Sequence, residues 1–151
     1  MSLTLEESLK VERFKVVTSR QAWVVDVARG VFTGYVTIFA AFIAGAVSLA
    51  TATNAVARLG PDLVARVLLL VAAFITCVAI ASTIQISFCL WRWYEYRHAE
   101  CKIYSEVPKP EAWAIAFELG FIAMMGASVG LVWFGYGVLV SIVQAAPSAA
   151  Q

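Results

Sequence analysis

The chain has 151 residues, of which 62% are hydrophobic and only 14% are charged, and its formal net charge is +1. An ordinary soluble domain has about 25% charged residues, and a soluble chain of this length could not bury so much apolar surface, so the composition indicates a membrane protein. The near-zero net charge gives no reason to expect a nucleic-acid partner. Three scattered cysteines, an odd number, predict no disulfide framework.

Residues 4–29 have the pattern of a helix. Thr4 and Glu7 form a capping box, in which the hydroxyl and the carboxylate each bond the other residue's backbone N–H. Acidic and basic residues alternate here, unlike in a secretory signal peptide. We expect an amphipathic cytoplasmic helix that lies on the membrane, docks a partner or packs on the protein's own loop. Since no Pro or Gly occurs before Gly30, this helix could also run on into the first span. Two apolar sets of residues recur near helical spacing. They are Leu9, Val16, Trp23 and Val27, and Phe14, Val17, Val24 and Ala28. Lys10, Arg13, Arg20 and Gln21 lie on the opposite face.

Three apolar runs are long enough to cross a bilayer, since a span needs about 20 residues. They cover residues 30–52, 63–91 and 112–143. Gly60-Pro61 marks a turn followed by a helix start, so the first two spans should form an antiparallel hairpin. The predicted fold is an all-α integral membrane protein with one membrane domain over residues 1–151, in which three transmembrane helices follow the amphipathic N-terminal helix.

The basic residues predict the orientation. Nine lie before the first span or between the second and third, whereas only Arg58 and Arg66 lie on the other side. The positive-inside rule then places the N-terminus and the loop 92–111 in the cytoplasm and the C-terminus outside. The simplest location is a bacterial inner membrane. Residues 144–151 are small and polar, and we expect a disordered tail.

Small residues recur along all three spans, and they let membrane helices approach closely. In the second span they are Ala65, Ala72, Thr76, Ala79 and Thr83; the glycines predicted to pack helices are Gly30, Gly34, Gly45, Gly120, Gly126 and Gly130. The pattern does not tell contacts within one chain from contacts between chains. Stripes on more than one face of the third span favour an outside partner.

Two polar residues lie within the predicted spans, Glu118 and Gln85. An ionisable group inside a membrane is a candidate functional residue. Glu118 could reach the headgroups, pair with Arg92 or Arg29, or relay protons or ions. Gln85 could line a pore or bond another helix, while the Ser and Thr residues near it could simply bond back to their own helix.

The stretch YEYRHAEC, residues 94–101, contains an E-x-x-H pair, Glu95 and His98, with Cys101 three residues on. A di-iron bundle would need two such motifs, and zinc would lack a fourth protein ligand, so we predict no metal and no cofactor. An aromatic and basic belt at the membrane boundary explains the stretch better. The residues predicted to contact lipid or a partner are Trp91, Arg92, Trp93, Arg97, His98 and Trp113.

No nucleophile–base pair, phosphate-binding glycine loop or haem-attachment motif is present in the sequence. We therefore expect a non-enzymatic small polytopic membrane subunit that packs into a larger assembly, or with itself, and stabilises or anchors it. Its partners would be the lipid bilayer and other membrane subunits. The alternative is a homo-oligomeric channel or membrane-disrupting effector.

Overall fold

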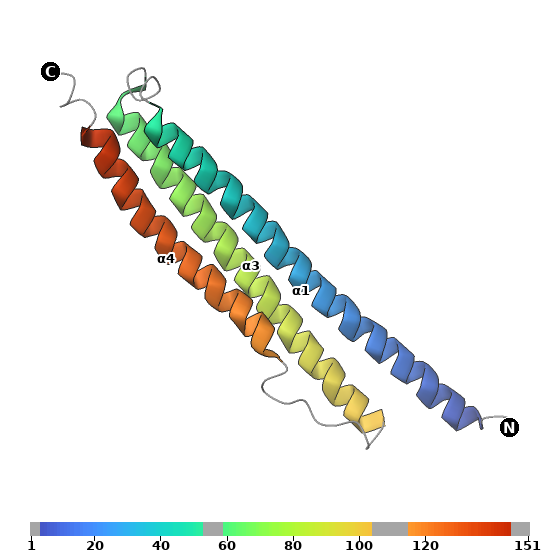
Figure 1. The fold of residues 1–151 in the computed structure, drawn as a ribbon. Helices are drawn as coiled ribbons and strands as arrows, with labels where there is room; N and C mark the ends of the chain where they lie inside the picture. Colours follow the sequence, from blue (N-terminus) through green and yellow to red (C-terminus); the bar gives the residue numbers. More distant parts are fainter. Residues whose placement is uncertain (1–3, 53–58, 104–114, 146–151) are drawn as a thin grey trace. The chain divides into compact units, whose positions relative to one another are not determined.

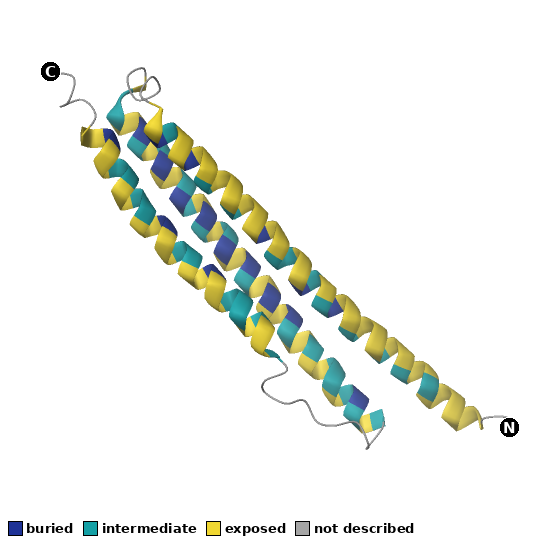
Figure 2. Cartoon of the chain, viewed as in Figure 1, coloured by how far each residue is buried: buried dark blue, intermediate teal, exposed yellow. Residues whose placement is uncertain are grey.

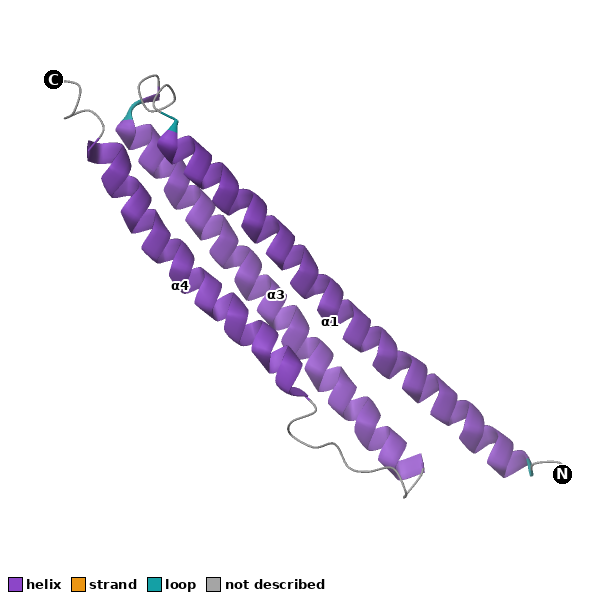
Figure 3. Cartoon of the chain, viewed as in Figure 1, coloured by secondary structure: helices purple, strands orange, loops and turns teal. Residues whose placement is uncertain are grey.

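The computed structural model describes residues 4–52, 59–103 and 115–145, and these residues form three long helices (Figures 1 and 3). The helices are α1 (Leu5–Thr51), α3 (Pro61–Ile103) and α4 (Ala116–Ala145). Each is long and apolar enough to span a membrane. The predicted all-α class with three apolar helices is confirmed, and it indicates a membrane location.

Helix α1 has 47 residues and would be about 70 Å long at 1.5 Å per residue, more than twice the hydrocarbon thickness of a bilayer. No separate amphipathic N-terminal helix is present, because residues 5–29 and the predicted span form one element. The reason is local: no proline occurs in this stretch, and a single glycine costs a helix only about 1 kcal/mol. Gly30 therefore does not interrupt it.

The N-terminus of α1 has the predicted capping box. The Thr4 backbone N–H donates to the Glu7 carboxylate at 2.8 Å, and the Glu7 N–H donates to the Thr4 hydroxyl at 3.3 Å. The bond from the Thr4 backbone and then the bond from its hydroxyl lower the pKa of Glu7. Two donors at the helix end are thereby satisfied.

Helix α3 begins at Pro61, as the turn signal predicts, and Gly60 has a positive φ of 80°. It continues to Ile103, so the first part of the predicted loop 92–111 is helical. The basic and aromatic residues there do not stop a helix, since no proline occurs between residues 92 and 103. The prolines of that loop, Trp113 and the tail lie outside the described residues.

The chain divides into two compact units. The first comprises residues 1–32 and 84–122, and the second comprises residues 33–83 and 123–151. In the second unit, two apolar clusters form the core. They consist of Ala46, Ala50, Val64, Leu68 and Val143, and of Ala72, Ile75 and Val132. The alanines let the backbones approach, as is typical of membrane helices.

Hydrogen bonds between helices supplement this core. The Tyr35 hydroxyl bonds that of Ser128, which in turn donates to the Met125 carbonyl at 2.7 Å. The Trp133 indole donates to Thr76 at 3.2 Å. Such bonds contribute about 0.6 kcal/mol each on average inside a membrane. The second unit is therefore held by apolar packing and by bonds between neutral groups.

In the first unit, the buried side chains are Val24, Ala28, Ile86, Cys89 and Glu100. Phe32 of α1 stacks on Phe121 of α4 with ring centroids 4.2 Å apart. Of the two apolar sets predicted on residues 4–29, the one that includes Phe14 and Ala28 is buried or half-buried. Leu9, Val16 and Trp23 of the other set are exposed. One apolar face of residues 4–29 thus packs against the rest of the first unit, and the other apolar face is largely exposed.

The three helices differ in how far they are buried (Figure 2). In its most apolar 18-residue stretch, α3 has a mean hydropathy of 2.7 and 28% of its residues are buried. The corresponding values for α1 and α4 are 1.8 and 11%. Helix α3 therefore supplies the largest share of the buried residues among the described part of the chain, while α1 and α4 leave most of their surface uncovered.

Candidate functional site

The glycines predicted to pack helices have open space where a side chain would be. A Cβ atom at Gly30, Gly34, Gly45, Gly120, Gly126 or Gly130 would meet nothing within 4 Å in the described part of the chain. In contrast, Ala72 and Ala79 of the α3 stripe are buried, and Thr76 and Thr83 are half-buried. The stripe on α3 is thus used inside the chain, whereas Gly30, Gly34, Gly126 and Gly130 are exposed and have open space beside them.

Glu118 lies in the first turn of α4, where the helix dipole favours an acid. It lines a small cavity of about 80 Å³ together with side chains of α1 and α3, among them Val24, Cys89 and Trp93. Its Oε2 atom is buried and has no hydrogen-bond partner among the described residues. The expected pairs with Arg29 or Arg92 are not formed there. An uncompensated buried carboxylate oxygen is costly, so a proton, water or another group is needed to satisfy it.

Gln85 is exposed on α3, and no hydrogen bond joins it to another described residue. Thr76 bonds back to the Ala72 carbonyl at 2.8 Å, as expected for a threonine in a membrane helix. The same hydroxyl also accepts the indole N–H of Trp133. The polar residues of the second predicted span therefore divide into two kinds: Thr76 serves helix packing, and Gln85 faces outward.

The E-x-x-H pair does not gather into a metal site. Glu95 accepts the Trp91 indole N–H and an Arg92 guanidinium N–H, each at 2.9 Å. These two bonds lower the pKa of Glu95, which lies outside the predicted spans. His98 packs edge-on against the Tyr94 ring, with centroids 4.6 Å apart. Across residues 4–52, 59–103 and 115–145, no three His, Cys, Asp or Glu side chains come together as metal ligands.

The aromatic and basic belt lies on the C-terminal part of α3. The Arg92 guanidinium stands 5.8 Å from the Phe88 ring and 6.0 Å from the Tyr96 ring, within cation–π range. Trp91 is 69% exposed, and His98 is exposed too, whereas Trp93 and Arg97 are half-buried. Trp113 lies outside the described residues. The sequence prediction thus assigned one role to side chains that point in different directions.

Two residues of the first unit have roles that the sequence interpretation missed. Glu100 is only 4% exposed, and it accepts a bond from Gln21 of α1 at 3.0 Å and pairs with Arg97. Gln21 was expected on the polar face. Seven-residue spacing places it with Phe14 and Ala28 instead, and spacing of three and four places Glu100 with Ile86 and Cys89. These spacings were the signal in the sequence from which the burial of Gln21 and Glu100 could have been predicted.

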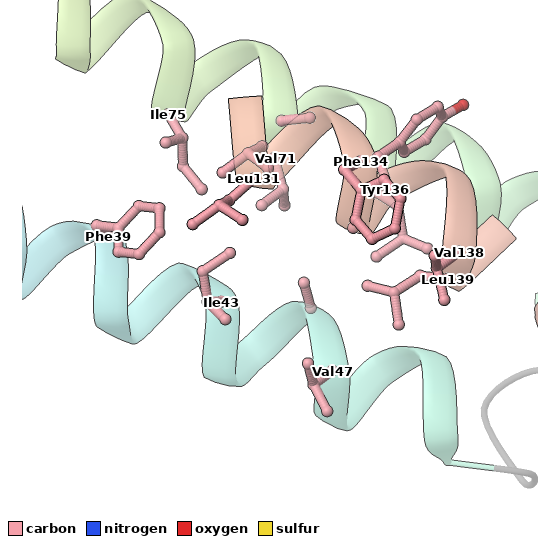
Figure 4. A pocket seen from close by; sticks show the side chains of 15 residues that line it. Phe39, Ile43, Val47, Val71, Ile75, Leu131, Phe134, Tyr136, Val138 and Leu139 are labelled. Atoms are coloured by element: carbon pink, nitrogen blue, oxygen red, sulfur yellow. The ribbon is translucent and has the colours of Figure 1, made fainter. Parts of the chain in front are cut away.

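An apolar cavity of about 390 Å³ lies in the second unit (Figure 4). Phe39, Ile43 and Val47 of α1 face Leu131 and Leu139 of α4 across it. Binding sites for small molecules usually combine apolar walls with a few polar groups that orient the ligand. The described lining has only the Tyr136 side chain to supply one. The cavity thus suits hydrocarbon and has little means to select a particular ligand.

Comparisons with protein-family models, with curated proteins and with solved structures found no significant match to this chain. What the protein does must therefore be inferred from its own residues. Their arrangement provides uncovered glycine faces, a buried ionic contact, one unsatisfied carboxylate and an amphipathic belt.

Proposed function

We propose that this protein is a small, non-enzymatic membrane subunit that packs into a larger membrane assembly and stabilises or anchors it. One observation carries the proposal: the glycines of α1 and α4 have open space where a side chain would be, and Gly34 and Gly126 among them are exposed. Small residues on uncovered membrane helices allow another helix to approach closely, and such approach is a main source of helix association in lipid.

The contrast with α3 supports this role. The small residues of the α3 stripe are buried or half-buried within the chain, whereas Gly34 of α1 and Gly126 of α4 are exposed. A chain whose small residues were all buried would present only large side chains to a partner helix, and these prevent close approach of the two backbones. We infer that the partner helices contact α1, α4 or both.

The N-terminal part of α1 offers a further surface for a partner or for lipid. Leu5 and Trp23 are 80% and 66% exposed, and Leu9 and Val16 lie between them on the same side of the helix. Under the positive-inside rule, this amphipathic segment and residues 92–111 face the cytoplasm. We place the protein in a bacterial inner membrane on the same grounds.

The rival function is a homo-oligomeric channel or a membrane-disrupting effector. Its specific support is the unbonded oxygen of Glu118, together with the outward-facing amide of Gln85. Polar groups that are unsatisfied in one chain could line a water-filled path formed by several chains.

Native mass spectrometry after mild extraction from the original membrane tests the proposal. The wild-type protein should be found in a heteromeric complex. Gly34→Leu and Gly126→Leu should abolish this complex while the chain still folds, because a Cβ atom added at either exposed position meets open space within the chain. Val36→Leu, at a 43% exposed position of α1, is the matched control and should keep the complex.

Circular dichroism of each variant checks that helix content is unchanged. A homo-oligomer that conducts ions in planar bilayers would reject the subunit role and support the channel. Retention of the complex by both glycine variants would show that these faces are not the interface.

A further inference from the structure

A groove of about 680 Å³ runs along one face of α3 in the first unit. Its volume falls within the range of about 300–1,000 Å³ typical of ligand sites. Its walls include Leu90, Trp91, Tyr94, His98 and Lys102 of α3, and Ile115 just before α4. The α3 residues recur at intervals of three and four, so they form one continuous face of the helix.

The polarity of this face changes along its length. Leu90, Trp91 and Ile115 make one end apolar, whereas His98 and Lys102 make the other end polar and basic. Trp91 and Lys102 are about 16 Å apart along the helix axis, at 1.5 Å per residue. A ligand that fits must therefore be amphipathic, with an apolar chain joined to a negatively charged group.

The charges in the groove leave a basic residue available to a ligand. Among the described residues that line the groove, Glu95 is the acidic one. Both oxygens of the Glu95 carboxylate already accept hydrogen bonds, one from Trp91 and one from Arg92. The Arg92 guanidinium also neutralises its charge. Lys102, in contrast, forms no ion pair with any described residue. The polar end therefore attracts an anion.

The position of the groove selects the kind of anion. The groove begins within the apolar run 63–91 and ends beyond it, beside aromatic side chains of the type that mark the membrane–water boundary. Phospholipid phosphates lie at that depth, and basic residues there attract acidic lipids. We propose that the groove is a binding site for an acidic phospholipid, with the phosphate beside His98 and Lys102 and an acyl chain along Leu90, Trp91 and Ile115.

This site depends on the membrane location of the chain and not on the proposed subunit role, so either idea can fail without the other. The test is a titration of the full-length protein in a neutral detergent with phosphatidylglycerol or phosphatidylcholine, with bound lipid counted by native mass spectrometry. Phosphatidylglycerol should bind more tightly. Lys102→Gln should weaken its binding about fivefold, the effect of one basic residue at a membrane surface.

Lys15→Gln is the matched control, since it removes the same charge from an exposed position of α1 that does not line the groove. It should leave lipid binding unchanged. Equal affinity for the two lipids, or equal losses in the two variants, would overturn the site. So would displacement of phosphatidylglycerol by inorganic phosphate alone, because that result would indicate a simple anion site.

Discussion

In the second unit, the buried side chains are apolar or hydroxylic and the hydrogen bonds between helices join neutral groups. In the first unit, a charged carboxylate, Glu100, is buried between α1 and α3. The sequence explains the difference, since Arg58, Asp62 and Arg66 are the chain's charged residues within the second unit. The second unit consists mostly of residues from the predicted spans. The first contains the charged segments at the predicted membrane boundary.

The comparison teaches which interactions hold each unit together. Lipid supplies no hydrophobic drive between helices, so the second unit depends on close packing and on a few neutral bonds. The first unit can use ionic contacts, because water and headgroups reduce the cost of placing charges there. Variants in the two units should therefore fail for different reasons.

The largest effect should come from Glu100→Ala in the first unit. It removes the bonds to Gln21 and Arg97 and leaves a half-buried guanidinium without this partner. Removing one member of a fully buried pair costs about 3–5 kcal/mol. We expect about 2–3 kcal/mol, because a quarter of the Arg97 side chain is exposed. The free energy of unfolding, from titration of the detergent-solubilised protein with sodium dodecyl sulfate, measures it.

Glu95→Ala is the control for this variant, since Glu95 is exposed and its partners lie on the same helix. It should change unfolding little. Equal stability of the two variants would mean that the Glu100 contact does not hold the first unit together.

A somewhat smaller loss should follow Ile75→Ala in the second unit. Ile75 is only 1% exposed, in a cluster with Ala72 and Val132. In water, such a change costs about 2–5 kcal/mol. We expect about 2 kcal/mol, because lipid removes most of the transfer term and leaves the cavity term. The same titration tests it, with Leu70→Ala at a 69% exposed position as control. Similar losses in both variants would contradict the assignment of this core.

A smaller effect, of the opposite sign, should follow Glu118→Gln, and Tyr35→Phe should give the smallest change. Glu118→Gln removes a negative charge whose Oε2 atom has no described partner, so it should raise the free energy of unfolding by about 1 kcal/mol. Tyr35→Phe, which breaks a satisfied bond in the second unit, should lower it by about 0.6 kcal/mol. Thermal unfolding of both variants in one detergent gives the comparison. A marked loss in Glu118→Gln would reveal a bonding partner for this carboxylate.

The three helices could be predicted because a bilayer requires about 20 apolar residues per crossing, and this requirement appears directly in the sequence. The helix ends were predicted less well. Apolar runs mark where a span leaves hydrocarbon, not where a helix stops, so α1 extends far before residue 30 and α3 continues to Ile103.

The side-chain contacts were harder to predict than the helices. Gln21 and Glu100 are 79 residues apart in sequence, and only the packing of α1 on α3 brings them together. Likewise, small-residue spacing marks a possible contact but does not say whether the chain itself uses it. Ala72 is buried and Gly34 is not, although both belong to predicted stripes.

The hydropathy of α3 has a consequence for how the protein is made. Its value of 2.7 exceeds the 1.8 of α1 and α4, although α3 is the helix most covered by protein in the finished fold. Contact with lipid therefore does not explain the excess. A strongly apolar segment has the most favourable free energy of transfer from the translocon into the bilayer. Helix α3 would thus insert without help once it is synthesised, and α1, which is made before it, and α4, which is made after it, would pack against this firmly inserted segment.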